Sequence, residues 1–150
     1  PEIYHEDEEF TPQLLLRAER VFTTNAKAYH YRLRNESITR KKDVKNTIKR
    51  LTDMESIIKN LQRMADIAPQ ESREALQRRV AQLTMDYLYN VIVQTHSLHY
   101  LEKCVNRLYQ QGLFPLPDKP YTQKYQWFRG LITHKWGRKL LCKLLPALPK

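Results

Sequence analysis

Basic and aromatic side chains gather in the first third of the chain. Arg20, Lys27 and Arg34 stand seven residues apart, a spacing that places them on one face of a helix. Tyr31 lies between the last two. A second group follows within ten residues and consists of Arg40, Lys41, Lys42, Lys45 and Lys49. Because Lys and Arg neutralise phosphates and a tyrosine ring can stack on an unpaired base, these residues are candidate nucleic-acid contacts.

The second basic group destabilises the helix that contains it. Lys41, Lys45 and Lys49 are spaced four apart, where like charges destabilise a helix. They also stand near the expected helix start, where the helix dipole disfavours cations. A bound anion such as a phosphate would offset both effects. The alternative is a solvated face that keeps the protein soluble.

Four basic residues near the C-terminal end are interleaved with large apolar side chains. They are Lys135, Arg138, Lys139 and Lys143. Such a pattern is typical of a cationic amphipathic helix. It fits a last helix that closes the core with a basic outer face, an added nucleic-acid surface, or a helix that meets a lipid interface or a partner protein.

Catalytic signatures are not evident in the sequence. Gly130 and Gly137 are seven apart, which does not match a phosphate-binding loop. Downstream of residue 102 the one acid is Asp118, too few for the converging carboxylates of a metal-dependent nuclease. His96 and His99 are three apart rather than the usual four, and we interpret them as structural. We therefore expect a non-enzymatic protein with no metal and no cofactor.

The cysteine content and the absence of a secretory segment favour an intracellular location, in the cytoplasm or with the nucleus or nucleoid. Cys104 and Cys142 are too few for a disulfide framework, and we interpret both as small apolar residues. The longest uncharged run, residues 87–101, is 15 residues long and contains several polar side chains. It is too short and too polar to span a bilayer.

Charge is unevenly distributed over the 150 residues, which carry a net charge of +10. Residues 1–10 hold five acids and no Lys or Arg, and residues 11–50 hold 11 basic and three acidic side chains. Residues 51–100 are nearly neutral, whereas residues 101–150 hold 10 basic and two acidic side chains. This distribution predicts two positively charged flanks around a structural middle.

The glycine content and the apolar periodicity together predict an all-α fold. Three glycines leave few positions for tight hairpins, and the long apolar patterns have a period near 3.6. We expect helices over about 12–34, 38–67 and 70–111, and a fourth helical pattern over 125–144 that the glycines can split. The architecture would be an elongated bundle of four or five helices with one long central helix.

These elements imply four regions. They are an acidic flexible tail over 1–10, a helical core over 11–112, a proline-rich connector over 113–120 and a basic helical segment over 121–150. The leading functional expectation is a nucleic-acid-binding protein, DNA or RNA, that contacts mainly the phosphate backbone as an accessory subunit. The alternatives are a helical adaptor that binds protein or a second copy, and a peripheral membrane protein that uses its C-terminal helix.

Overall fold

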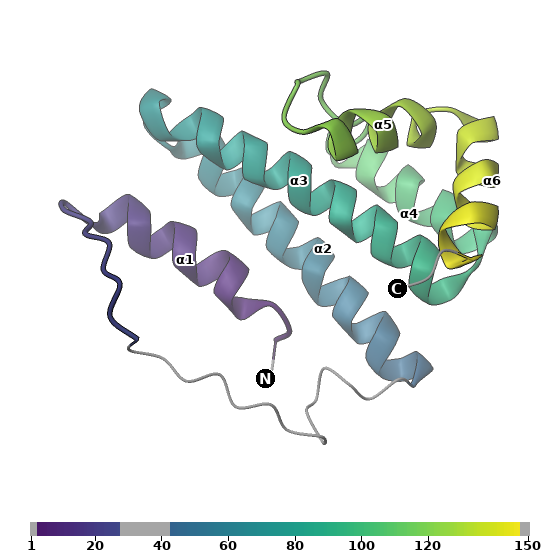
Figure 1. Ribbon diagram of the computed structural model, residues 1–150, viewed down its shortest axis with the longest axis horizontal. Helices are drawn as coiled ribbons and strands as arrows, with labels where there is room; N and C mark the ends of the chain where they lie inside the picture. The colour runs from purple at the N-terminus through teal and green to yellow at the C-terminus, as the bar shows by residue number, and fades with distance from the viewer. Residues whose placement is uncertain (1–2, 28–42, 148–150) are drawn as a thin grey trace.

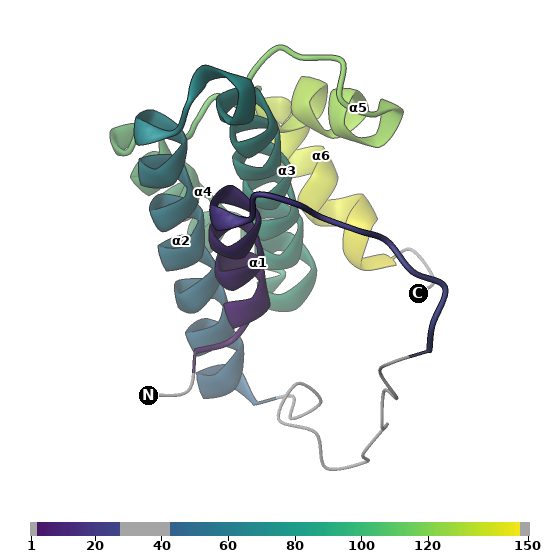
Figure 2. The same cartoon turned by 90° about the vertical axis from the view of Figure 1, so that its left-hand side faces the viewer.

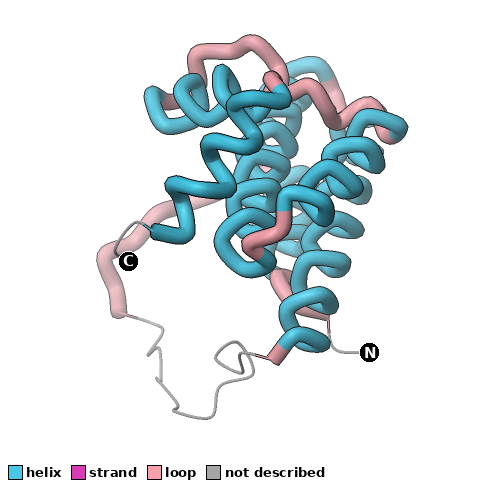
Figure 3. Tube along the Cα trace, turned by 90° about the vertical axis from the view of Figure 1, so that its right-hand side faces the viewer, coloured by secondary structure: helices cyan, strands magenta, loops and turns pink. Residues whose placement is uncertain are grey.

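The computed structural model describes residues 3–27 and 43–147, and within these ranges it is helical with no strand (Figures 1 and 3). The elements are α1 (Glu6–Arg17), α2 (Val44–Ile67), α3 (Gln70–Thr95), α4 (Leu98–Gln110), α5 (Gln123–Ile132), α6 (Lys135–Leu144) and the 3-10 helix η2 (Leu145–Ala147). The predicted all-α class is therefore confirmed for the described residues.

The hairpin of α2 and α3 forms the centre of the molecule. Asp43 caps α2 by accepting a hydrogen bond from the Asn46 N–H at 2.7 Å. The helix expected over 38–67 therefore begins at Val44. The apolar stripe of α2, in which apolar side chains recur every three or four residues, is buried from Leu51 to Ala65, whereas Val44 and Ile48 are exposed. Helix α2 ends at Ile67, just before Pro69. This stripe packs on the buried face of α3 and gives the bundle its main core.

The expected long central helix over 70–111 is divided into α3 and α4. His96 takes a left-handed conformation with φ 53°, and the Ser97 side chain caps α4 by accepting from the Tyr100 N–H at 3.2 Å. The β-branched residues Val91, Ile92 and Val93 lie within α3 and do not interrupt it. The serine cap decides the position because it satisfies the first free N–H groups of a new helix. The division lets α4 turn back along α3 (Figure 1).

The proline-rich segment 113–120 contributes to the core as well as connecting α4 to α5. Leu113, Phe114 and Leu116 are buried in it. After α5 the chain turns at Thr133 and His134, so the division of the last helical pattern falls between the two glycines. Gly137 packs so closely on α5 that a Cβ at this position would collide with the Leu131 carbonyl group.

The N-terminal helix differs most from expectation. We expected an acidic flexible tail and a helix that starts at Pro12, but α1 begins at Glu6 and contains Pro12. Four acids form its first turn, where the helix dipole favours negative charge. Residues 18–27 are not helical, although their apolar spacing continues the period. No residue of α1 is buried, so tertiary packing does not extend the helix beyond Arg17.

Candidate functional site

The first basic group does not form the predicted helix face in the described residues. Arg20 and Lys27 lie exposed in the non-helical segment that follows α1. The other predicted contacts in this region, Tyr31, Arg34, Arg40, Lys41 and Lys42, lie outside the described residues. The predicted shared helix face of Arg20 and Lys27 is therefore wrong, because α1 ends at Arg17.

Lys45 and Lys49 stand exposed in the first turns of α2. Lys49 Nζ is 2.7 Å from Asp53 Oδ2 and 4.9 Å from the centroid of the Tyr4 ring. Partial burial acts to raise the pKa of Asp53, but the bonds from Lys49 and from the Tyr4 N–H lower it overall. Lys49 thus helps to hold the residues before α1 on α2, in addition to any contact with a ligand.

Arg138 has a different role from the other basic residues of α6. Its side chain is buried, with 6% of the residue exposed, and its Nε donates to Glu102 Oε1 of α4 at 2.8 Å. Its Nη1 donates to the carbonyl oxygens of Ile132 and Thr133 at the end of α5. The prediction that Arg138 extends an exposed basic surface is therefore wrong. It satisfies free carbonyls at a helix end and ties α6 to α4 and α5.

The solvent side of α6 carries both apolar and cationic side chains. Trp136, Leu140 and Leu144 follow one another at intervals of four and are 60%, 38% and 48% exposed. Lys135, Lys139 and Lys143 are also exposed and have the same spacing. At 100° per residue the three lysines adjoin the apolar row on one side. We call these six residues the α6 surface.

The apolar residues of α6 lie on two different sides of the helix. Leu141 and the following Leu145 are buried in the core, and Gly137 faces α5. The ring of His134 stacks on that of Trp136, with centroids 5.9 Å apart. The sequence pattern alone did not show which apolar residues of α6 are buried and which are exposed. Its apolar residues form a continuous arc around the helix, and either edge of that arc fits the helical period.

A buried polar cluster between α2, α3 and α4 was not predicted from the sequence. Glu55 is 7% exposed and accepts hydrogen bonds from the Tyr87 hydroxyl at 3.1 Å, from Arg107 at 2.9 Å and from Gln111 at 3.1 Å. Lys59 Nζ lies 3.3 Å from the same carboxylate. The available signal was that Glu55 directly follows a residue of the apolar stripe in α2.

The charges in this cluster are fixed by its geometry. Burial acts to raise the pKa of Glu55, but the bonds from Gln111 and Arg107 lower it overall, so the carboxylate is ionised. Burial raises the pKa of the Tyr87 hydroxyl and of the Cys104 thiol. Cys104 is therefore a protonated, inert thiol beside the ion pair, and the cluster fastens three helices together.

Comparison of the chain with protein-family models, curated proteins and solved structures found no match. Within residues 3–27 and 43–147 no three His, Cys, Asp or Glu side chains are grouped to hold a metal ion. No helix in the described part of the chain has both the length and the apolar character needed to cross a bilayer.

Proposed function

We propose that the protein binds peripherally to anionic phospholipid surfaces through the α6 surface. The observation that carries this proposal is the row of Trp136, Leu140 and Leu144, which stays exposed on a folded helix beside three lysines. An interfacial helix combines these features: its apolar side chains enter the acyl boundary while its lysines meet the lipid phosphates.

The electrostatic and apolar contributions of the α6 surface to the binding free energy are of the size expected for reversible membrane binding. Each lysine near an anionic surface contributes about 1 kcal/mol at physiological salt. Full burial of a large apolar side chain contributes roughly 1.5–3 kcal/mol, and the three on α6 begin about half exposed. The two contributions are comparable, so we expect binding to require both the anionic lipid and the apolar row.

Replacing Lys135, Lys139 and Lys143 with Gln should weaken binding to vesicles that contain phosphatidylserine by at least tenfold, because the electrostatic contribution is lost. Replacing Trp136 and Leu140 with Ser should weaken it further. Co-sedimentation with vesicles of phosphatidylcholine, with and without phosphatidylserine, measures both effects.

A matched control has the same change of charge elsewhere. Lys27, Lys45 and Lys119 are exposed and lie outside α6, so the triple Gln variant at these positions should bind vesicles as the unmodified protein does. Equal loss in both triple variants would show that total charge, rather than α6, governs binding. If α6 binds a protein and does not bind vesicles, that result would favour the adaptor function.

Nucleic-acid binding at the start of α2 is a second candidate. Lys45 is exposed in the first turn of α2, which contains no acidic residue, and a phosphate would offset its unfavourable interaction with the helix dipole. Figure 2 shows α2 and α6 on opposite sides of α3. A nucleic acid at the start of α2 would therefore occupy a different face from the α6 surface.

For this second candidate, binding to single- or double-stranded DNA or RNA should weaken steeply as salt rises. Replacing Lys41, Lys45 and Lys49 with Gln should reduce the slope of log K against log salt by about two units, since each phosphate contact contributes about 0.7–0.9. Fluorescence anisotropy with labelled oligonucleotides over a salt series measures the slope. Absence of binding at low salt to all four polymers would contradict this function.

A further inference from the structure

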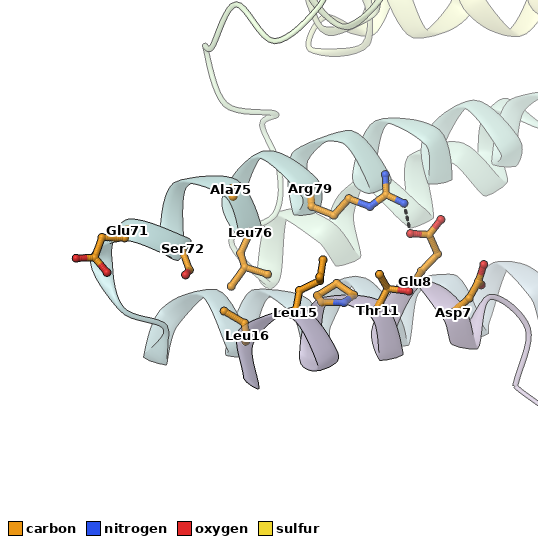
Figure 4. Close-up of a pocket in the computed structure, with 11 residues that line it drawn as sticks. Asp7, Glu8, Thr11, Leu15, Leu16, Glu71, Ser72, Ala75, Leu76 and Arg79 are labelled. Atoms are coloured by element: carbon orange, nitrogen blue, oxygen red, sulfur yellow. Dashed lines mark hydrogen bonds and ion pairs between the residues drawn. The ribbon is translucent and has the colours of Figure 1, made fainter. Parts of the chain in front are cut away.

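A groove separates α1 from the N-terminal part of α3. Its volume is about 660 Å³, and its apolar lining includes Leu15 and Leu16 of α1 and Leu76 of α3. Figure 4 shows Leu15 and Leu76 in the space between the two helices and Leu16 at the end of α1. Leu15 and Leu16 are 52% and 39% exposed, so the groove presents apolar surface that the protein itself leaves uncovered.

Polar contacts fix the position of α1 relative to α2 and α3. Glu8 forms an ion pair with Arg79 of α3, and Glu9 accepts hydrogen bonds from the Asn60 side chain of α2 at 3.2 Å. Because no residue of α1 is buried, these contacts position the helix without filling the space beneath it.

The charges around the groove select for a basic occupant. Asp7 and Glu71 are exposed and lie toward its opposite ends in Figure 4. Arg79 is the basic residue of the lining, and it is already engaged by Glu8. An occupant that fits must therefore combine an apolar row with positive charges on its flank.

The α6 surface has this combination and a matching length. Its row from Trp136 to Leu144 covers nine residues, about 12 Å along a helix. The groove lining runs from Asp7 to Leu16 on α1 and from Glu71 to Arg79 on α3, so each wall is about as long as this row. Figure 1 places α1 and α6 toward opposite ends of the bundle, so a chain's own α6 does not reach its own groove.

We propose that the groove between α1 and α3 binds the α6 surface of a second copy of this chain. The contact is heterologous, since a different surface of each copy takes part, and it lets copies add one after another. It depends on the exposed α6 surface and does not depend on lipid binding. A copy whose α6 occupies a groove has no free α6 surface for a membrane, so self-association and membrane binding compete.

Sedimentation velocity over a range of protein concentrations tests the contact in the absence of lipid. We expect association at low salt that weakens as salt rises. The variant D7K/E71K reverses the groove acids and should weaken association at least tenfold, and K139E/K143E should do the same. Combining all four substitutions restores complementary charge and should recover association. Circular dichroism verifies that each variant is folded.

The outcomes separate this proposal from the membrane function. D7K/E71K leaves α6 intact and should still bind vesicles that contain phosphatidylserine, whereas K139E/K143E should lose them. A protein that remains monomeric at low salt and high concentration would overturn the proposal. So would association that D7K/E71K leaves unchanged, or that the four-residue combination fails to restore.

Discussion

Replacing Glu55 with Ala should lower the free energy of unfolding by about 3 kcal/mol. The change leaves the buried Tyr87 hydroxyl without its acceptor and removes the partner of Arg107 and Gln111. Leaving buried polar groups unsatisfied costs about 1–3 kcal/mol each, and the half-exposed Arg107 head can turn to water. For a chain of this length we expect the melting temperature to fall by roughly 6–12 °C.

A milder variant and a pH series distinguish this network from simple loss of packing. Tyr87→Phe keeps the ring and the ion pair, and should cost about 1 kcal/mol. Because the folded state lowers the pKa of Glu55, the ionised carboxylate adds stability above its unfolded pKa, about 4.3. That contribution is lost as the pH falls through the lower, folded pKa.

Urea unfolding between pH 7 and pH 3 measures both effects. The unmodified protein should lose stability at the acid end of the series more steeply than Glu55→Gln, which has no carboxylate to protonate. Parallel pH profiles for the two proteins would show that Glu55 is not stabilised in its ionised form.

Replacing Gly137 with Ala should destabilise the protein by about 3 kcal/mol, even though alanine is the better helix former. The added Cβ would collide with the backbone of Leu131, which cannot rotate away as a side chain can. Helix α6 must then shift from α5, and the bonds of Arg138 to the end of α5 are strained with it.

Gly130 supplies the matched control for this substitution. It is an exposed position of α5, and a Cβ there meets nothing within 4 Å. Gly130→Ala should therefore raise the free energy of unfolding by about 1 kcal/mol through helix propensity alone. Thermal unfolding followed by circular dichroism compares the two variants. Similar effects of the two substitutions would contradict the close contact between α5 and α6.

Helix α2 shows how much of this fold the sequence predicts, and α1 shows where prediction stops. In α2 the period of apolar residues and the proline after its end agree, so the end of the helix and its core from Leu51 to Ala65 were predicted correctly. The predicted start at residue 38 was wrong, since α2 begins at Val44, and the first two apolar residues of the period, Val44 and Ile48, are exposed. In α1 the apolar residues have the same period, but none of them is buried. Beyond Arg17 the period continues without a helix, and the residues that follow are exposed, so no tertiary burial supports a longer helix there.

The candidate site was predicted in part, and for a similar reason. The lysines of α6 are exposed as a basic amphipathic helix requires, yet Arg138 from the same pattern is buried against Glu102. Whether Trp136 is buried or exposed also depends on which side of α6 packs on the bundle. These outcomes follow from the turn at Thr133 and His134, which no local pattern specified.

The two-residue connections of the bundle have a consequence for the order of folding. Turns of two residues join α2 to α3, α3 to α4 and α5 to α6, so these neighbours meet after closing very short loops. Docking of α1 on α2 requires closure of the much longer segment between Arg17 and Val44, and it buries no side chain in return. Because local contacts form fastest, the central hairpin should assemble first and α1 should dock last. Because α1 precedes α2 and α3 in the sequence, it is synthesised before them, yet it would dock only after they have paired.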